Sequence, residues 1–200
     1  MARQASYDRD KVLKSAMDLF WAKGFHATSL KDLEQALDMR PGSIYAAFGS
    51  KEGLFAEALR LYSGQSQGGL SEVLAGGGSR LGALANYVRQ LGGQNRGEVP
   101  SRACMLVKTI LEMPDDDPSL RGLAEELIDR MELTLTEVLR AAQAEGELPA
   151  EADPARLAAR LQTELIGLRA YAQRINTEDR VAQVAEDIAR GIEALSWRAA

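Results

Sequence analysis

The stretch that decides the fold runs over residues 24–55 and reads GFHATSLKDLEQALDMRPGSIYAAFGSKEGLF. Its opening glycine suits the end of a helix, and Thr28 or Ser29 is well placed to cap the start of the next one. Pro41 fits the first turn of a further helix, where a missing N–H costs little. The stretch therefore predicts two short helices joined by a tight turn at residues 38–39.

Two short amphipathic helices separated by a tight turn are typical of a helix-turn-helix, whose second helix enters the major groove of DNA. We expect Arg40 to donate two hydrogen bonds to a guanine edge, and Thr28, Tyr45 and Lys51 to hold the phosphate backbone. The full set of residues expected at DNA is Thr28, Ser29, Arg40, Pro41, Gly42, Ser43, Tyr45, Ala46 and Lys51. A plain packing unit is the alternative, in which Tyr45 is a rim residue and Lys51 a solvated charge.

Helical spacing of apolar residues continues on both sides of this stretch, and strand-like alternation is nearly absent. The expected helices cover residues 8–23, 29–37, 40–48, 51–62, 81–91, 101–113, 118–145, 154–174 and 178–197. Residues 64–79 hold six glycines in sixteen positions and are expected to form a mobile connection or a frayed helix end. We therefore predict an all-α fold, with a helix-turn-helix domain over residues 1–50 and a helical domain over residues 51–200.

The chain has 200 residues, a net charge of −5, one histidine and one cysteine. A single cysteine forms no internal disulfide, and the polar N-terminus resembles no secretory signal, so we expect a cytoplasmic protein away from membranes. His26 and Cys104 supply too few ligands for a zinc finger, and the patterns of serine nucleophiles and phosphate loops are absent. We therefore expect no cofactor, no metal and no catalytic residue.

Residues 8–60 resemble the N-terminal domain of the TetR family of bacterial transcriptional repressors. That family reads roughly K-G-T-L-Y-x-x-F-x-S-K-E-x-L in its recognition helix, and residues 41–54 read P-G-S-I-Y-A-A-F-G-S-K-E-G-L here. The other matching residues are Phe20, Gly24, Phe25, Thr28, Ser29, Leu33, Ala36 and Met39. The family usually has Gly in the turn where this chain has Asp38, and Ser or Thr where it has Arg40. Because Asp tolerates the left-handed conformation better than most residues, the turn is expected to survive.

The resemblance implies a dimer that binds a palindromic DNA operator and is released by a small-molecule inducer, of unknown identity, in the second domain. The last two helices, over residues 154–174 and 178–197, would form a four-helix interface between subunits, and their apolar stripes suit that role. The alternative is that both stripes face the core of their own subunit. Two recognition helices must lie about 34–36 Å apart to read a palindrome, so an inducer that favours another separation weakens DNA binding.

Cys104 is the chemically distinctive residue of the second domain. With Ser101 as helix cap, it sits in the first turn, and Lys108 lies four residues further on. A helix N-terminus and nearby cations favour the thiolate, so we predict that Cys104 and Lys108 sense a ligand, an oxidant or an electrophile. Some TetR-like sensors are similar in having a cysteine followed by a lysine in this domain. The alternative is a buried small hydrophobe.

Two other classes of function are weighed against a DNA-binding regulator. A helical protein-interaction module without DNA binding would use the same N-terminal helices to bind a protein. An enzyme built in a helical bundle is disfavoured, because no cofactor fingerprint and no Glu-x-x-His pair occurs in the sequence.

Overall fold

The computed structural model describes residues 8–94, 99–113 and 118–196, and nine α-helices make up this part of the chain. The helices are α1 (Arg9–Lys23), α2 (Leu30–Leu37), α3 (Pro41–Phe48), α4 (Lys51–Ala75), α5 (Arg80–Gly93), α6 (Met105–Glu112), α7 (Pro118–Ala144), α8 (Pro154–Tyr171) and α9 (Glu178–Glu193). The all-α prediction is confirmed. Over the described ranges, no helix combines the length and the apolar character that crossing a bilayer requires.

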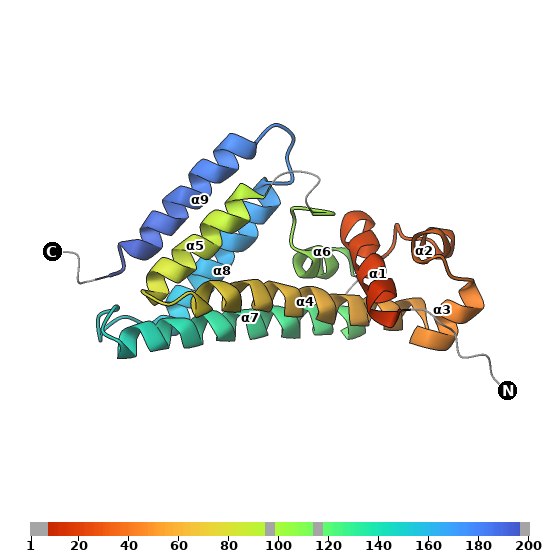
Figure 1. The fold of residues 1–200 in the computed structure, drawn as a ribbon, viewed down its shortest axis with the longest axis horizontal. Helices are drawn as coiled ribbons and strands as arrows, with labels where there is room; N and C mark the ends of the chain where they lie inside the picture. Colours follow the sequence, from red (N-terminus) through yellow and green to blue (C-terminus); the bar gives the residue numbers. More distant parts are fainter. Residues whose placement is uncertain (1–7, 95–98, 114–117, 197–200) are drawn as a thin grey trace.

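Helices α4 and α7 lie side by side along the long axis of the molecule (Figure 1). Helices α1 to α3 sit at one end of this pair, and α5, α8 and α9 pack against the other end. The short helix α6 lies between the two groups, close to α1. The molecule is therefore elongated, with its N-terminal helices set apart from its C-terminal ones.

The ends of the first three helices follow the signals in the sequence. Gly24 has φ +88°, a left-handed conformation that suits glycine, and its N–H donates to the Phe20 carbonyl at 2.7 Å. Ser29, rather than Thr28, caps α2 and forms a reciprocal capping box with Asp32. Asp38 ends α2 in the left-handed conformation, with φ 50° and ψ 44°, so the turn survives without glycine.

Buried apolar residues form two clusters, and α4 contributes to both. The first cluster unites α1, α2 and α3 with the first half of α4, with α6 and with the start of α7. The second unites the end of α4 with α5, α8, α9 and the end of α7. Phe55 and Leu59 of α4 lie in the first cluster, whereas Leu70 of the same helix lies in the second. At 1.5 Å per residue, the 25 residues of α4 span roughly 38 Å and join the two clusters rigidly.

The glycine-rich segment differs from its prediction, because most of it is regular helix. Helix α4 continues to Ala75 and ends at Gly76, so only the last glycines of the run form a turn. Leu70 is fully buried, and the position of Gly69 lies against the Tyr87 ring. Packing against α5 therefore outweighs the low helix propensity of glycine, which costs about 1 kcal/mol per residue.

The start of α6 also differs from its prediction. The helix begins at Met105 with Cys104 as its cap, so Ser101 does not cap it. Instead, the side-chain oxygen of Gln173 accepts hydrogen bonds from the N–H groups of Arg102, at 3.0 Å, and Ala103, at 3.2 Å. A side chain remote in the sequence thus holds residues 101–103 as a loop.

The starts of the last helices follow the sequence in part. Pro118 begins α7 and Asp153 caps α8, as predicted, whereas the cap expected at Asp117 lies outside the described residues. Thr177 precedes α9, but its hydroxyl donates to the Arg174 carbonyl at 3.1 Å rather than capping the helix.

The apolar stripes of α8 and α9 face the interior of their own subunit. Leu161, Leu168, Val181 and Ile192 are all at least nine-tenths buried within the single chain. Most residues of the two stripes therefore fill the core of their own subunit, as the alternative drawn from the sequence expects. A dimer interface formed by α8 and α9 stays a prediction. Val184 of the α9 stripe is 42% exposed, so this residue and the outer faces of both helices are open to another subunit.

Helices α5 and α9 pack closely at Gly92, which generates a testable prediction. A Cβ atom at position 92 would collide with the Cβ atom of Ala185, whereas one at Gly93 would meet open space. We expect Gly92→Ala to lower the free energy of unfolding by about 1–3 kcal/mol through overpacking. Gly93→Ala is the matched control and should be neutral or stabilising by roughly 0.5–1 kcal/mol. Thermal and urea denaturation measure both, and equal stabilities would contradict the close packing.

Candidate nucleic-acid interface

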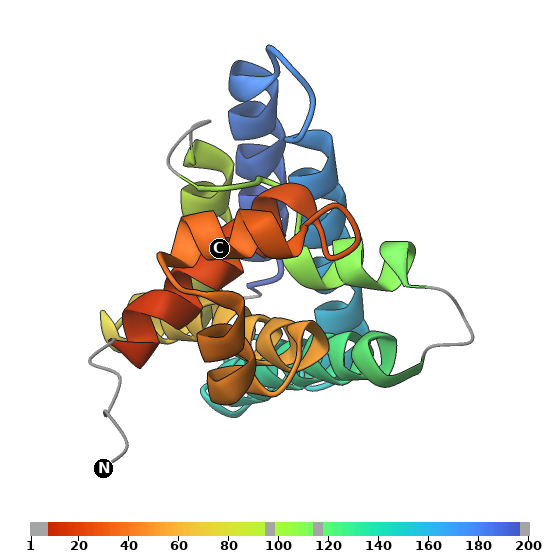
Figure 2. The ribbon, with the colours of Figure 1, turned by 90° about the vertical axis from the view of Figure 1, so that its right-hand side faces the viewer.

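The second helix of the motif presents one polar edge to solvent. Figure 2 looks onto the end of the molecule that carries α1 to α3. On α3, Ile44 and Phe48 are buried against the first cluster, and Tyr45 is 41% exposed. The remaining residues that were predicted to meet DNA on this helix are Gly42, Ser43 and Ala46, which are exposed, and Pro41, which is half-buried. The structure therefore brings the predicted edge together on one accessible face.

Arg40 stands immediately before α3 with an extended backbone, at φ −74° and ψ 150°. Its side chain is exposed and makes no capping bond to the helix, and within the described ranges it joins no ion pair. A solvated guanidinium at the start of a helix is free to donate two hydrogen bonds to one partner, as recognition of a guanine edge requires.

Lys51 is the first residue of α4, directly after the cap Ser50, whose hydroxyl accepts from the Gly53 N–H at 3.1 Å. The Lys51 ammonium lies 4.3 Å from the centroid of the Phe25 ring, which fixes the direction of the side chain. Partial burial lowers the pKa of Lys51 below its ordinary value. The positive end of the helix dipole adds to this charge, so the start of α4 suits a phosphate group.

Thr28 differs from its prediction. Its side chain is fully buried, and its hydroxyl donates to the Gly24 carbonyl at 2.6 Å. The structure contradicts the prediction that this hydroxyl faces a phosphate, because the hydroxyl is needed to close the loop between α1 and α2.

Ser29 is exposed, but its hydroxyl is also engaged within the protein. It donates to the Asp32 carboxylate at 2.7 Å and accepts from the Asp32 N–H at 3.2 Å. Asp32 further pairs with Lys23 at 2.6 Å, and the bonds from Lys23 and Ser29 hold the pKa of Asp32 far below its usual range. Ser29 therefore stabilises the start of α2, which carries the exposed Lys31 in its first turn. Sequence reasoning missed Lys31, although a lysine beside a helix cap is a signal for phosphate contact.

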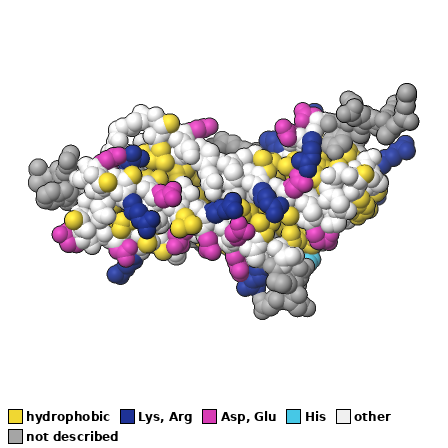
Figure 3. Space-filling model, turned by 90° about the horizontal axis from the view of Figure 1, so that it is seen from below, with side chains coloured by type: hydrophobic (Ala, Val, Ile, Leu, Met, Phe, Trp, Pro, Cys, Tyr) yellow, Lys and Arg dark blue, Asp and Glu magenta, His cyan; other side chains and the backbone are white. Residues whose placement is uncertain are grey.

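On the lower face of the described part of the molecule, basic side chains do not form one large patch (Figure 3). Figure 3 shows that Lys and Arg side chains are spread along the lower face of the molecule, between acidic and apolar ones. With a net charge of −5, nonspecific attraction to DNA is modest. We therefore expect recognition to depend on a few cations held in position, above all Arg40 and Lys51 at the starts of α3 and α4.

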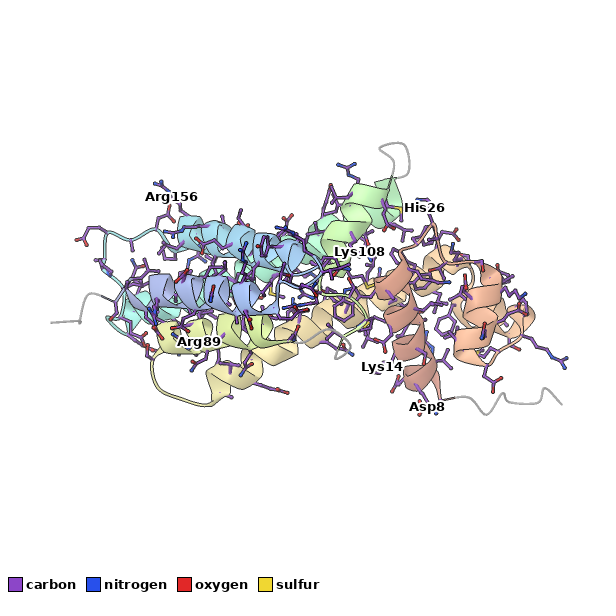
Figure 4. All side chains as sticks on the ribbon, turned by 90° about the horizontal axis from the view of Figure 1, so that it is seen from above. Asp8, Lys14, His26, Arg89, Lys108 and Arg156 are labelled. Carbon is purple, nitrogen blue, oxygen red and sulfur yellow. The ribbon has the colours of Figure 1, made fainter. Side chains whose placement is uncertain are left out.

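Cys104 and Lys108, the predicted sensing pair, have separate partners. Cys104 is half-buried and lines a cavity together with Tyr62 of α4. The Lys108 ammonium instead donates to the carbonyls of Trp21, at 2.7 Å, and Ala22, at 3.3 Å, where α6 meets α1 (Figure 4). The cation expected beside the thiol therefore holds the end of α1, and burial lowers its pKa. Cys104 therefore lies in the wall of the cavity and is not paired with the Lys108 ammonium.

The arrangement defines a helix-turn-helix DNA-binding protein with a separate helical domain. The family model described as bacterial regulatory proteins, tetR family, matches residues 12–58, and that of the tetracyclin repressor-like C-terminal domain matches residues 77–194. The chain belongs to the TetR family and is a DNA-binding transcriptional regulator, not an enzyme.

Individual relatives agree with this assignment. The transcriptional repressor ComR of Escherichia coli is 28% identical over 184 residues, which cover 92% of this chain and 88% of ComR. A cysteine mutant of the TetR family regulator CifR, solved with a 26-base-pair operator, is 34% identical with a TM-score of 0.86, covering 94% of this chain and 98% of CifR. The reduced form of NemR of Escherichia coli is similar in fold, with a TM-score of 0.76 at 20% identity. The match covers 94% of this chain and 96% of NemR.

The positions of Arg40 and Lys51 predict different effects of their removal. Arg40→Ala should cost about 1–3 kcal/mol on a preferred sequence and relax the preference for it, because a base contact is lost. Lys51→Ala should weaken all sequences about equally and reduce the salt slope of binding by about 1. Fluorescence anisotropy with the promoter fragment beside the encoding gene, and with a scrambled duplex, measures both.

The control for this pair is Arg156→Ala, which removes one exposed cation at the end of the molecule remote from α1 to α3 (Figure 4). It should leave affinity and salt slope unchanged. If Arg40→Ala and Lys51→Ala behave like this control, the assignment of the DNA contacts is wrong although the fold stands.

Proposed function

We propose that this protein is a cytoplasmic repressor that binds a palindromic operator as a dimer and leaves it when a small molecule enters the helical domain. Residues 1–50 read the DNA, and residues 51–200 bind the ligand and dimerise. The observation that carries the proposal is the continuity of α4, which holds a candidate phosphate contact at one end and walls a cavity further along.

Helix α4 connects the cavity directly to the DNA-binding helices, so it can transmit the effect of a bound ligand to them. Tyr62 lies eleven residues after Lys51 on the same helix, or roughly 16 Å along its axis. A ligand that displaces the Tyr62 region tilts the start of α4 and with it α3. In a dimer, such tilts change the separation of the two recognition helices from the one that the operator requires. The ligand shifts the equilibrium only by its difference in affinity for the two arrangements.

A second connection runs from α6 to α1. Besides the Lys108 bonds, the Glu112 carboxylate accepts from the Phe25 N–H at 3.1 Å, and this carboxylate fills the place where a Cβ atom on Gly24 would lie. The Trp21 indole N–H donates to the Ala103 carbonyl at 2.7 Å, beside the cavity-lining Cys104. Movement of the cavity wall therefore reaches the DNA-binding helices through α1 as well as α4.

The outer faces of α8 and α9 support the dimer. On α8, Thr163, Gly167 and Ala170 are exposed and small, and on α9 Gly191 is exposed and Val184 is 42% exposed. A Cβ atom placed at Gly167 or Gly191 would meet nothing within 4 Å inside the subunit. Small residues let two helices approach closely, so a four-helix interface between subunits would use these faces.

A charge on the proposed interface should separate the subunits. We expect Gly167→Arg to yield a folded monomer with weak operator binding, because a long charged side chain keeps the helices apart. Light scattering after size-exclusion chromatography measures the mass. The matched control is Gly122→Arg on α7, an equally open and exposed position, which should leave a dimer. A Gly167→Arg protein that remains dimeric contradicts the proposed interface.

Sensing through Cys104 stays a prediction with a clean test, because the chain has one cysteine. Alkylation by iodoacetamide at neutral pH adds bulk to a cavity of about 70 Å³ and should lower operator affinity at least tenfold. Mass spectrometry follows the labelling and a gel shift follows the binding. Cys104→Ser treated in the same way should bind the operator normally. Labelled wild-type protein that still binds the operator tightly would rule out this residue as a sensor.

A further inference from the structure

Two neighbouring hollows lie beside α4. An inner hollow of about 70 Å³ and an outer one of about 240 Å³ share the lining residues Tyr62, Ser66, Tyr87, Leu91 and Arg169. The space far exceeds the 10–15 Å³ or so that one water molecule needs, so it has room for a small organic molecule. Helices α4, α5, α7 and α8 and the start of α6 all contribute to its wall.

Most of the inner wall is apolar. Leu106, Ile128, Met131, Leu165 and Ile166 line it together with Leu91. A wall of this kind favours a ligand with an apolar body, because burial of apolar surface drives its entry. The ligand's polar groups must then meet the few polar side chains on the wall.

Two of these polar side chains, Tyr62 and Gln162, are buried and incompletely hydrogen-bonded. Tyr62 is 4% exposed and Gln162 is 7% exposed. Among the described residues the Gln162 side-chain oxygen has no hydrogen-bond partner, and the Tyr62 hydroxyl has none of good geometry, although it interacts with the Cys104 thiol and the Met105 N–H. The Gln162 amide nitrogen donates to the Ile128 carbonyl at 3.3 Å, so only the oxygen is left over. Buried polar atoms of folded proteins nearly always find a partner, so the Gln162 oxygen points to a bound molecule, and the Tyr62 hydroxyl beside it is available to the same molecule.

Arg169 supplies the charge of the site. Its Nε atom donates to the Arg102 carbonyl at 3.1 Å, and its guanidinium carbon lies 5.8 Å from the ring centroids of both Trp21 and Tyr62. Within the described part of the chain, Arg169 has no carboxylate partner. Burial raises the pKa of the Tyr62 phenol, so the Tyr62 hydroxyl stays protonated and can donate. A cation and a donor on one wall suit a carboxylate.

We propose that the ligand of this cavity is a small, mostly apolar monocarboxylate that also carries a hydroxyl group. Its carboxylate lies at Arg169 and the Tyr62 hydroxyl, its body lies against the apolar wall, and its hydroxyl donates to the Gln162 oxygen. This inference rests on the proposed function, because it names the class of inducer that the repressor binds.

Trp21 provides a reporter inside the native protein. It lines the outer hollow and meets the Tyr62 ring edge-on, with centroids 5.0 Å apart. The chain has two tryptophans, and Trp197→Phe leaves Trp21 as the sole one. Its fluorescence therefore follows occupation of the cavity.

The experiment titrates the full-length Trp197→Phe protein with 4-hydroxybenzoate, 3-hydroxybenzoate and the corresponding neutral amides. We expect the preferred acid to bind at least tenfold more tightly than its amide and to release the promoter fragment in a gel shift. Benzoate, which lacks the hydroxyl, should bind more weakly than that acid. Arg169→Gln should abolish the preference for the acid, whereas Arg156→Gln on the same helix should keep it.

Several outcomes overturn the inference. These are equal affinity for acid and amide, no binding of any acid, or binding without release of DNA. The comparison of acid and amide uses one protein, so it decides the question even if Arg169→Gln fails to fold. The gel shift without ligand separates the two proposals, since operator binding by ligand-free protein supports the proposed repressor while the ligand class fails. If the ligand-free protein does not bind the operator, the proposed function itself is wrong.

Discussion

The structure depends on the continuity of α4. One helix supplies Phe55 and Leu59 to the N-terminal cluster and Leu70 to the C-terminal one, so neither cluster is complete without it. Because backbone hydrogen bonds make a helix stiff along its axis, the two halves of the molecule cannot move independently. The proposed division at residue 50 therefore falls at the start of the helix that joins the two clusters.

Several of the groups that we propose to carry function lack a hydrogen-bond or ion-pair partner among the described residues. Most charged side chains of the described ranges are solvated or paired, as in the Arg89 contacts with Glu186 and Glu193 at 2.7 Å. Arg40 faces solvent unpaired before α3, and the buried oxygens of Tyr62 and Gln162 face the cavity. An unpaired polar group costs free energy when it is buried, and a partner from outside the chain recovers that cost.

The local parts of the candidate site follow from sequence. Gly24, Ser29 and Asp38 act within one turn of their own helices, so short-range signals predict them well. Thr28 was misplaced because its choice between solvent and the Gly24 carbonyl depends on how α1 packs beside α2. The role of Lys108 was predicted wrongly for a related reason. Its partners, the carbonyls of Trp21 and Ala22, lie 87 and 86 residues away, and no sequence pattern predicts contacts over that separation.

The sequence by itself determined the all-α class, the helices of the described ranges and the motif of α2 and α3, and it predicted the edge that we propose for DNA, because capping and periodicity act over a few residues. Only the tertiary structure decided that residues 64–75 are helical, that the stripes of α8 and α9 face inward, and that Tyr62, Gln162 and Arg169 share one cavity. These features arise from contacts between segments far apart in the chain. Their free energy is set by packing, which overrides local preference.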